Sequence, residues 1–217
     1  MTASVLFALI CSAISLQVVM WISIALWRWR AARAAGRSQV LTTAAATGAW
    51  SGLREFRVVH REFEDADQTQ CSYYLEPVDG APLPSFRAGQ FLTLTLAIAD
   101  HRAVSTVTRC YSLSDCPDPR RYRLTIKRLL APASQPELPA GLASNYLHDR
   151  VHEGNVLKAR APAGNFFIDS DAATPAVFIA CGIGVTPIMS MLRYVIAEQP
   201  LRPVHLYYGV RNLSCQQ

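Results

Sequence analysis

RCYSLSDCP, residues 109–117, places an arginine, a tyrosine and two serines close together where a β-strand is predicted to end. An arginine side chain can hold a phosphate through two parallel hydrogen bonds. Because alternate residues of a strand point to the same face, Tyr111 is expected beside Arg109, with its ring free to lie against a planar heterocycle. Ser112 adds a hydroxyl and a backbone N–H. The group suits a dinucleotide with a flat redox ring, but a strand end with a surface arginine and a core tyrosine fits the stretch equally well.

The sequence on both sides of this stretch predicts a sheet of short strands. From residue 53 to residue 131, runs rich in Val, Ile, Tyr, Phe and Thr alternate with turns that contain Pro or Gly. Leucine and threonine alternate strictly over residues 92–96. Many short strands with regular turns are typical of a small antiparallel β-barrel. A helix is predicted at residues 143–152, and one more strand at 156–167.

The pattern changes after residue 170. An unbroken apolar strand, of the kind that is buried on both faces, is predicted at 176–181. A glycine turn follows it, then a helix at 186–199 and a second strand at 204–210. The order of strand, glycine turn, helix and strand is the start of a parallel α/β sheet.

Two further stretches predict anion binding at helix N-termini. Gly141 and Ser144 lie where the first helix begins, and the free N–H groups and positive dipole end found there favour a negative charge. A serine that only caps the helix is the alternative. Gly182, Gly184 and Thr186 lie between the apolar strand and its helix, where open α/β sheets bind ligands, although a proline replaces the third glycine of G-x-G-x-x-G.

In their order and spacing, these stretches resemble the ferredoxin–NADP reductase superfamily, which includes the reductase domain of flavohaemoglobins. RCYSLS is similar to the family's R-x-Y-S flavin motif, and residues 141–167 to its flavin-pyrophosphate segment and the following strand. GIGVTPIMSML, residues 182–192, resembles the pyridine-nucleotide glycine turn of the family, and FRAGQFLTL, residues 86–94, the strand that opens the barrel. The resemblance runs from about residue 50 to residue 212.

The resemblance implies FAD on the barrel, facing NAD(P)H on a Rossmann-like domain. Arg109 would hold an FAD phosphate, Tyr111 would pack on the isoalloxazine ring, and Ser112 would hydrogen-bond near its N5. Ser112 and Tyr111 are thus the implied catalytic residues, and no metal site is implied. The implied cofactor-binding residues are Arg109, Tyr111, Ser112, Lys127, Gly141, Ser144, Gly182, Gly184 and Thr186.

The sequence also departs from the family pattern. Cys181 replaces a residue that is usually glycine, and Ala88 replaces a proline in the turn before the opening strand. Relatives continue beyond the second α/β strand to more parallel strands and a nicotinamide motif with Cys-Gly, and close relatives often carry a [2Fe–2S] ferredoxin domain. Because this sequence has neither, we expect a truncated product or a fragment.

The first 27 residues contain no charged side chain. Such a run is long enough to cross a bilayer, which needs about 20 apolar residues. A cleaved signal peptide would have a basic segment before the run, and a buried core helix is the remaining alternative. Four arginines follow the run, which by the positive-inside rule places them in the cytoplasm, near anionic lipid.

The predicted fold class is therefore an N-terminal transmembrane helix, an antiparallel β-barrel and an incomplete Rossmann-like α/β domain. The predicted domains are a membrane anchor with a basic segment at 1–37, a linker at 38–50, the FAD domain at 51–170 and a partial NAD(P) domain at 171–217. The predicted location is the inner or plasma membrane, crossed once, with the soluble domain in the cytoplasm.

Composition excludes several other classes of site. Without the four arginines of the juxtamembrane segment, the 21 basic residues fall to 17 against 16 acidic ones, so no nucleic-acid partner is expected. None of the six cysteines forms a C-x-x-C pair, which disfavours a zinc site or an iron–sulfur cluster held by this chain. His148 and His152 are four residues apart on the predicted helix, but no third metal ligand lies near them in the sequence.

These observations predict a membrane-anchored, FAD-dependent NAD(P)H oxidoreductase that delivers electrons to an iron–sulfur or haem partner, which could be a [2Fe–2S] ferredoxin. Two alternatives stay open: a flavoprotein remnant that binds FAD but cannot use NAD(P)H, and a membrane-tethered interaction domain without a cofactor. NADH and NADPH are equally compatible with the sequence.

Overall fold

The computed structural model describes residue 20 and residues 49–100, 103–132, 134–169 and 174–210. The chain divides into two units, Met1–Thr43 and Ala44–Gln217. All elements below belong to the second unit.

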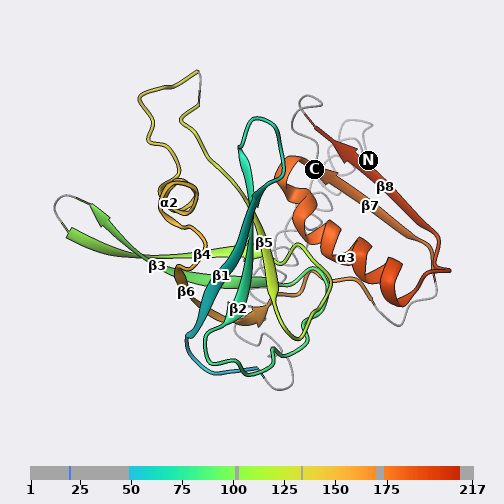
Figure 1. The fold of residues 1–217 in the computed structure, drawn as a ribbon. Coiled ribbons are helices and arrows are strands. Elements are labelled where there is room, and N and C mark those ends of the chain that lie inside the picture. Colours follow the sequence, from blue (N-terminus) through green and yellow to red (C-terminus); the bar gives the residue numbers. More distant parts are fainter. Residues whose placement is uncertain (1–19, 21–48, 101–102, 133, 170–173, 211–217) are drawn as a thin grey trace, which may run out of the picture. The chain divides into compact units, whose positions relative to one another are not determined.

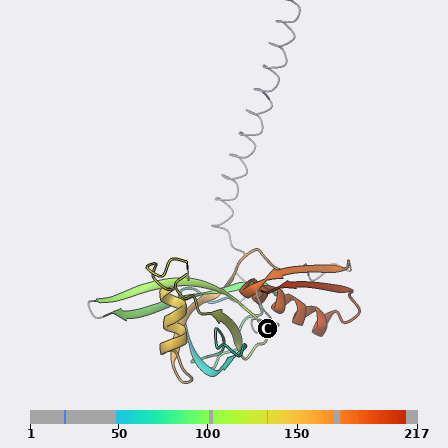
Figure 2. The same cartoon turned by 90° about the horizontal axis from the view of Figure 1, so that it is seen from above.

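An antiparallel sheet of six strands forms the first part of this unit, in the order β4-β3-β6-β1-β2-β5 (Figure 1). In both views the β3–β4 hairpin extends beyond the other strands (Figure 1, Figure 2). The strands are β1 Arg54–Phe63, β2 Gln70–Pro77, β3 Phe91–Asp100, β4 Ala103–Ser112, β5 Tyr122–Lys127 and β6 Val156–Ala163.

Alternation along the strands builds the core of this sheet. In β3 the side chains of Leu92, Leu94 and Leu96 are buried, while Thr93 and Thr95 between them are half-buried. Full burial of one leucine side chain stabilises the fold by about 1.5–3 kcal/mol. The strand predicted from the alternation over residues 92–96 is therefore present, because it has one apolar face to bury.

The two edge strands of the sheet meet at one point. Leu113, just beyond β4, forms an isolated bridge with Leu124 of β5. The Ser114 N–H donates to the carbonyl oxygen of Arg123 at 2.9 Å. On either side of this bridge, β4 pairs only with β3, and β5 only with β2, among the described residues. We call this open line between β4 and β5 the seam.

The second part of the unit is a parallel pair of strands with one helix. Strand β7 Ala176–Cys181 pairs with β8 Val204–Gly209. Between them come a 3₁₀ turn, η1 Gly182–Gly184, and helix α3 Val185–Glu198, which lies along one face of the pair (Figure 2). The remaining helix, α2 Leu142–Arg150, lies between β5 and β6 in the chain.

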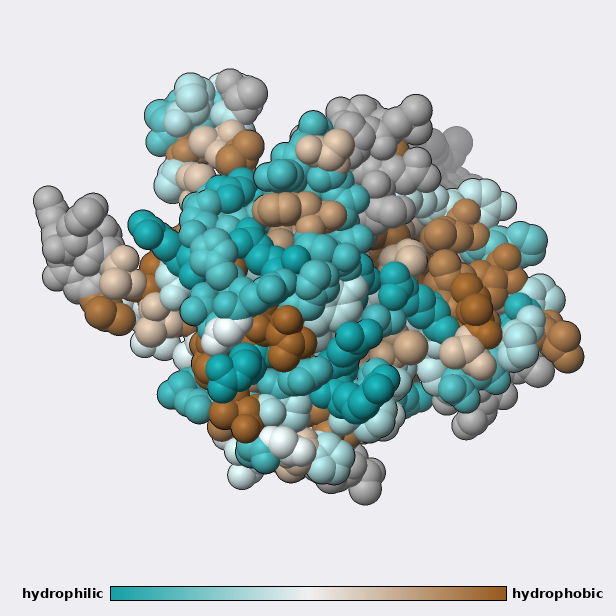
Figure 3. Space-filling model, viewed as in Figure 1, coloured by the Kyte–Doolittle hydropathy of each residue, from teal (hydrophilic) through white to brown (hydrophobic). Residues whose placement is uncertain are grey.

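Strand β7 differs from the expectation that it is buried on both faces. Phe178 is buried toward α3, but Val177 and Ile179 are exposed, with relative exposures of 59% and 74%. Tyr207, the partner of Ile179 on β8, is exposed too. Figure 3 shows the pair from the opposite side, that of α3, and apolar surface is visible there as well. The difference arises because α3 covers only one face of the two-stranded sheet.

The predicted fold class needs a correction at the N-terminus. Within the part of the chain that the structure describes, no helix is both long enough and apolar enough to span a bilayer. The predicted anchor at 1–37 lies outside the described residues except for Met20, and the predicted linker at 38–50 is described only from residue 49. The fold of the described residues is that of the sheet and the α/β unit.

Candidate functional site

Strand β4 carries the three residues that the sequence singled out first. Arg109 pairs with Leu94 of β3, and Tyr111 with Leu92, so both side chains lie on the same face. The Arg109 side chain is exposed, and its Nη1 donates to the carbonyl oxygen of Thr108 at 2.8 Å. No carboxylate among the described residues pairs with this guanidinium. Arg109 is thus a cation that is available to an anion.

Tyr111 and Ser112 complete the end of β4. The half-buried ring of Tyr111 packs against the core of the sheet, and this burial raises the pKa of its phenol. The positive charge of Arg109 acts on that pKa in the opposite direction, which is consistent with the two side chains being neighbours. Ser112 is half-buried, and its hydroxyl has no hydrogen-bond partner among the described residues. An aromatic ring, a cation and an unused hydroxyl therefore stand together.

The seam continues from this group along β5. Lys127, the last residue of β5, is half-buried and pairs with Gln70 of β2. The other edge of β5 faces the seam at Lys127, and the free edge of β4 faces it at Arg109–Ser112. Backbone N–H and C=O groups at an unpaired edge are ready to bind a ligand or another chain. The structure thus brings Lys127 and the β4 group to two sides of one open line.

The start of α2 is attached to the same end of β5. The Gly141 N–H donates to the carbonyl oxygen of Leu129 at 2.8 Å, and the Leu129 N–H donates to Ser144 Oγ at 3.3 Å. A Cβ on Gly141 would lie 2.7 Å from Leu129 Cβ and 2.7 Å from Ser144 Oγ, so only glycine fits there. This contact holds the helix start beside Lys127.

Ser144 is not the N-cap of α2. Gly141 occupies that position, no side chain caps the helix, and its first turn contains no acidic residue. The Ser144 hydroxyl instead donates to the carbonyl oxygen of Gly141 at 3.3 Å. The first N–H groups of α2 thus lack a side-chain partner, and such groups favour an anion together with the helix dipole.

Sequence reasoning missed other groups around this helix start. Asn145 donates from Nδ2 to the Leu129 carbonyl oxygen at 3.0 Å, while its buried Oδ1 has no partner among the described residues. Leu129, Leu130 and Leu142 are large apolar side chains that lie exposed beside it. Leucines next to charged residues could have indicated a site here. In the sequence alone, however, this stretch looks like an ordinary loop.

His148 and His152 do not form a metal site. His148 is buried, and its Nε2 lies 2.9 Å from the carbonyl oxygen of Ile126. His152 is exposed, and its Nδ1 lies 2.9 Å from Arg61 Nη1. No cluster of three or more metal-binding side chains is present among the described residues. His148 has a structural role, since it ties α2 to β5.

Burial of His148 predicts a loss of stability in acid. Desolvation lowers the pKa of its imidazole below the usual 6.5, helped by the charges of Arg128 and Arg61, and its buried Nδ1 has no partner. A proton is therefore bound more tightly in the unfolded chain. The stability contributed by neutral His148 is complete above pH 6.5 and falls as the pH drops toward the lower, folded pKa, by up to about 1.4 kcal/mol per pH unit.

Urea unfolding of the parent chain and of His148→Gln at pH 8 and pH 5.5 measures this effect. The glutamine amide can still donate to Ile126 but does not titrate, so the variant should lose less stability between the two pH values. His205→Gln, at an exposed position of β8, is the control and should keep the pH dependence of the parent. Equal losses in the parent and in His148→Gln would refute the prediction.

The glycine turn lies at the start of α3, as the sequence predicted. Gly182 has a φ of +50°, a conformation that favours glycine. A Cβ on Gly182 or Gly184 would meet no atom within 4 Å, so both glycines border open space. Thr186 is buried and donates from Oγ1 to the Ile183 carbonyl oxygen at 3.1 Å. No side chain caps α3, which leaves its first N–H groups open to an anion.

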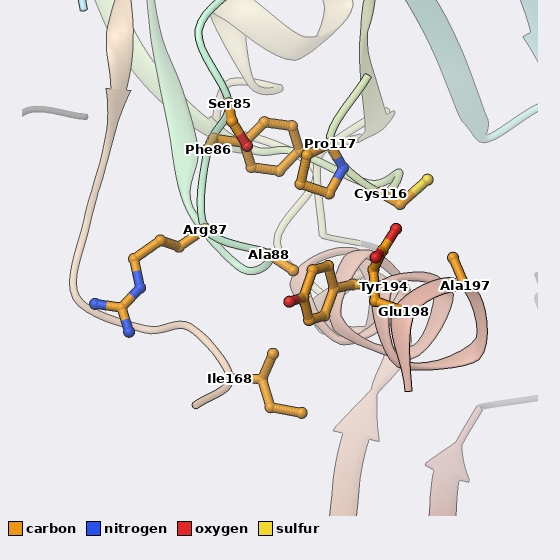
Figure 4. A pocket seen from close by; sticks show the side chains of 10 residues that line it. All are labelled: Ser85, Phe86, Arg87, Ala88, Cys116, Pro117, Ile168, Tyr194, Ala197 and Glu198. Carbon is orange, nitrogen blue, oxygen red and sulfur yellow. The ribbon is translucent and has the colours of Figure 1, made fainter. Parts of the chain in front are cut away.

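A pocket of about 390 Å³ lies where the sheet meets α3, and it is not the predicted site. Figure 4 shows Phe86 and Pro117 on the side of the sheet, and Tyr194 and Glu198 on the side of α3. None of the predicted cofactor-binding residues lines this pocket. The predicted residues of β4, β5 and α2 lie along the seam instead, where an unpaired cation, free strand edges and an uncapped helix start come together.

Comparison with known proteins identifies the family. The family described as "Oxidoreductase NAD-binding domain" matches residues 178–216. The flavohemoprotein of Halalkalibacterium halodurans is 40% identical over 167 residues, and that of Pseudomonas aeruginosa is 40% identical over 172 residues. These matches cover 77% and 79% of this chain, but it spans only 39% and 40% of the two relatives.

Solved structures give the same result. The flavohem-like FAD/NAD-binding domain of a nitric oxide dioxygenase from Vibrio cholerae has a TM-score of 0.67 at 30% identity, over 76% of this chain and 65% of that one. Phthalate dioxygenase reductase has a TM-score of 0.60 at 29% identity, over 76% of this chain and 46% of that one. Motifs, fold and relatives agree, and the chain belongs to the ferredoxin–NADP reductase superfamily of FAD- and NAD(P)-dependent oxidoreductases.

Proposed function

We propose that this chain binds FAD along the seam, accepts electrons from NAD(P)H and passes them to a haem or iron–sulfur acceptor. One observation carries the proposal: the end of β4 presents an unpaired arginine, a half-buried tyrosine ring and an unused serine hydroxyl beside a free sheet edge. A surface arginine and a core tyrosine, the plain alternative, would not require the hydroxyl or the open edge.

The residues of the seam fit the parts of FAD. Arg109 would hold a phosphate, the Tyr111 ring would support the flat ring system, and Ser112 would donate a hydrogen bond near flavin N5. The open N-terminus of α2, at Gly141 and Ser144, would bind the pyrophosphate. FAD, when bound, takes up a hydride and a proton from NAD(P)H and solvent, releases NAD(P)⁺ and gives up its two electrons singly.

The glycine turn would receive the second nucleotide. Gly182 and Gly184 let a dinucleotide approach the backbone, and the open start of α3 favours its phosphates. The relatives support the class of acceptor, since some are named flavohemoproteins and one structure is titled as a module for electron transfer from pyridine nucleotides to [2Fe-2S]. The placement of the soluble domain on the cytoplasmic side stays a prediction, which protease protection in intact cells can test.

Two measurements on the purified chain test the function. A titration with FAD, followed by the quenching of flavin fluorescence, should saturate, and the complex should show the absorbance of bound flavin. Anaerobic mixing with NADH or NADPH should then bleach this absorbance. A chain that binds no FAD is an interaction domain without a cofactor, and a chain that binds FAD but is not bleached is the remnant without NAD(P)H activity.

Ser112→Ala separates binding from reactivity. The hydroxyl is expected to contact flavin N5, where charge and a proton change during hydride transfer, so its loss should slow reduction more than it weakens binding. A neutral hydrogen bond is worth about 0.5–1.5 kcal/mol, which predicts a reduction rate roughly two- to tenfold lower with FAD still bound. Stopped-flow absorbance measures the rate, and Ser105→Ala on the same strand is the control. An unchanged rate would remove Ser112 from the reacting centre.

A further inference from the structure

Two side chains of α3 hydrogen-bond to Asp115, which lies three residues after the end of β4. Ser190 Oγ donates to the backbone carbonyl oxygen of Asp115 at 2.7 Å, and Arg193 Nη1 donates to Asp115 Oδ1 at 3.0 Å. The same Oδ1 accepts from the Cys116 N–H at 2.9 Å. Ser190 is completely buried, and it shares one helix face with Arg193, three residues on. One aspartate is thus fixed to α3 through its backbone and its side chain.

Asp115 lies between the two halves of the proposed site. It follows Ser112, the last residue of β4, by three positions. On α3, Ser190 is one helical turn, or about 6 Å, from Thr186 in the nucleotide-binding first turn. A short path through Asp115 therefore joins the hydroxyl expected at the flavin to the helix start expected at the nicotinamide.

We propose that Asp115 is a positioning residue that sets the nicotinamide-binding turn against the flavin-binding strand through Arg193 and Ser190. This inference rests on the proposed function, which it deepens by naming the contact that aligns the two cofactors. Asp115 does not touch the reacting atoms in this account. It acts by limiting the movement of α3 relative to the end of β4.

Alignment has a large effect on a reaction between two rings. Reacting atoms must approach to about 3–3.5 Å, and a displacement of 1 Å can lower a rate by about 100-fold. The fold depends much less on this contact, because the Asp115 and Arg193 side chains remain 26% and 40% exposed. Partly exposed ion pairs contribute little to stability. Removing the carboxylate should thus lower the rate of hydride transfer while the protein stays folded.

Asp115→Ala tests the rate. We expect the limiting rate of FAD reduction by NADH or NADPH to fall roughly tenfold, with the Kd for FAD within twofold of the parent value. Asp115→Asn keeps an oxygen that can accept from Arg193 and Cys116, and should retain most of the rate. Asp118→Ala is the matched control, because Asp118 lies on the same loop and pairs only with the nearby Arg120 in the ion pairs of the described residues.

A second measurement does not depend on activity. Hydrogen exchange of the α3 amides in the FAD-free chain should be faster in Asp115→Ala and in Arg193→Ala, and the double variant should be no faster than either single one. The same non-additive pattern is expected for the reduction rates, since both changes remove one shared contact. Additive effects in both measurements would overturn the inference.

Failure of the inference can be told apart from failure of the proposed function. A parent chain that NADH and NADPH do not reduce overturns the proposed function, and the inference with it, whatever the variants do. A parent chain that is reduced at the same rate as Asp115→Ala overturns the inference alone. A lower rate that accompanies a matching loss of FAD affinity also overturns it, because Asp115 would then be part of the flavin site.

Discussion

Arg109→Ala should weaken the binding of FAD by between about tenfold and 100-fold. The guanidinium is exposed at the end of β4 and pairs with no carboxylate among the described residues, so its charge is available to a phosphate. A hydrogen bond to a charged group contributes about 1.5–3 kcal/mol, and each 1.4 kcal/mol is a factor of ten in affinity. The Kd from a titration of flavin fluorescence measures the loss.

The fold should not suffer from the same substitution. Among the described residues, the Arg109 side chain hydrogen-bonds only to the Thr108 carbonyl oxygen, and such exposed positions tolerate change within about 0.5 kcal/mol. Arg57→Ala is the matched control, because Arg57 is also an exposed strand arginine but lies on β1, away from the seam. Because the contact is ionic, the difference between the two variants should shrink as salt is added. If Arg109→Ala binds FAD as tightly as Arg57→Ala, RCYSLS is not the flavin motif.

The sequence predicted the elements of this site better than the contacts between them. A period of two places Arg109 and Tyr111 on one face wherever β4 forms, and glycines before an apolar helix mark the turn of Gly182 and Gly184. These patterns are local, so they can be recognised without knowledge of the partner strands. The assignment of the residues to FAD still stays a prediction that the titrations above must test.

Such patterns do not predict contacts between residues that are far apart in the sequence. The bridge from Leu113 to Leu124 closes the sheet, and the bonds from α3 to Asp115 join residues that are 75 and 78 positions apart. No periodicity indicates which side chains meet across such distances. The exposed face of β7 was mispredicted for a related reason, since an apolar run indicates that burial is possible but not that a layer covers each face.

Gly89→Ala should destabilise the folded chain by roughly 2–6 kcal/mol, the largest effect on stability expected here. Gly89 has a φ of +108°, which other residues rarely adopt. A Cβ at this position would collide with the Phe166 carbonyl oxygen and the Met191 side chain, and would lie 3.0 Å from Phe167 Cα. The methionine can move aside, but the backbone of 166–167 cannot move without breaking its own contacts.

Hydrogen bonds tie the turn around Gly89 to the segment after β6 and to the end of β4. In the turn around Gly89, the carbonyl oxygen of Ala88 accepts from the Ile168 N–H at 3.2 Å, and Gln90 Nε2 donates to the Gly164 carbonyl oxygen at 3.2 Å. The carbonyl oxygen of Gln90 accepts from the Leu113 N–H at 2.9 Å, next to the bridge that closes the sheet. A shift of this turn would therefore reach the end of β4 and the packing of Met191 at once.

Thermal unfolding provides the measurement, since each kcal/mol lowers Tm by about 2–4 °C in a chain of this size. Gly80→Ala is the matched control: Gly80 has a φ of +68°, but a Cβ there would meet no atom within 4 Å. That variant carries the backbone strain without the collision, so the difference between the two variants isolates the close approach. If Gly89→Ala lowers Tm no more than Gly80→Ala, the turn is not packed tightly against 166–167, and the close approach at Gly89 does not contribute to stability.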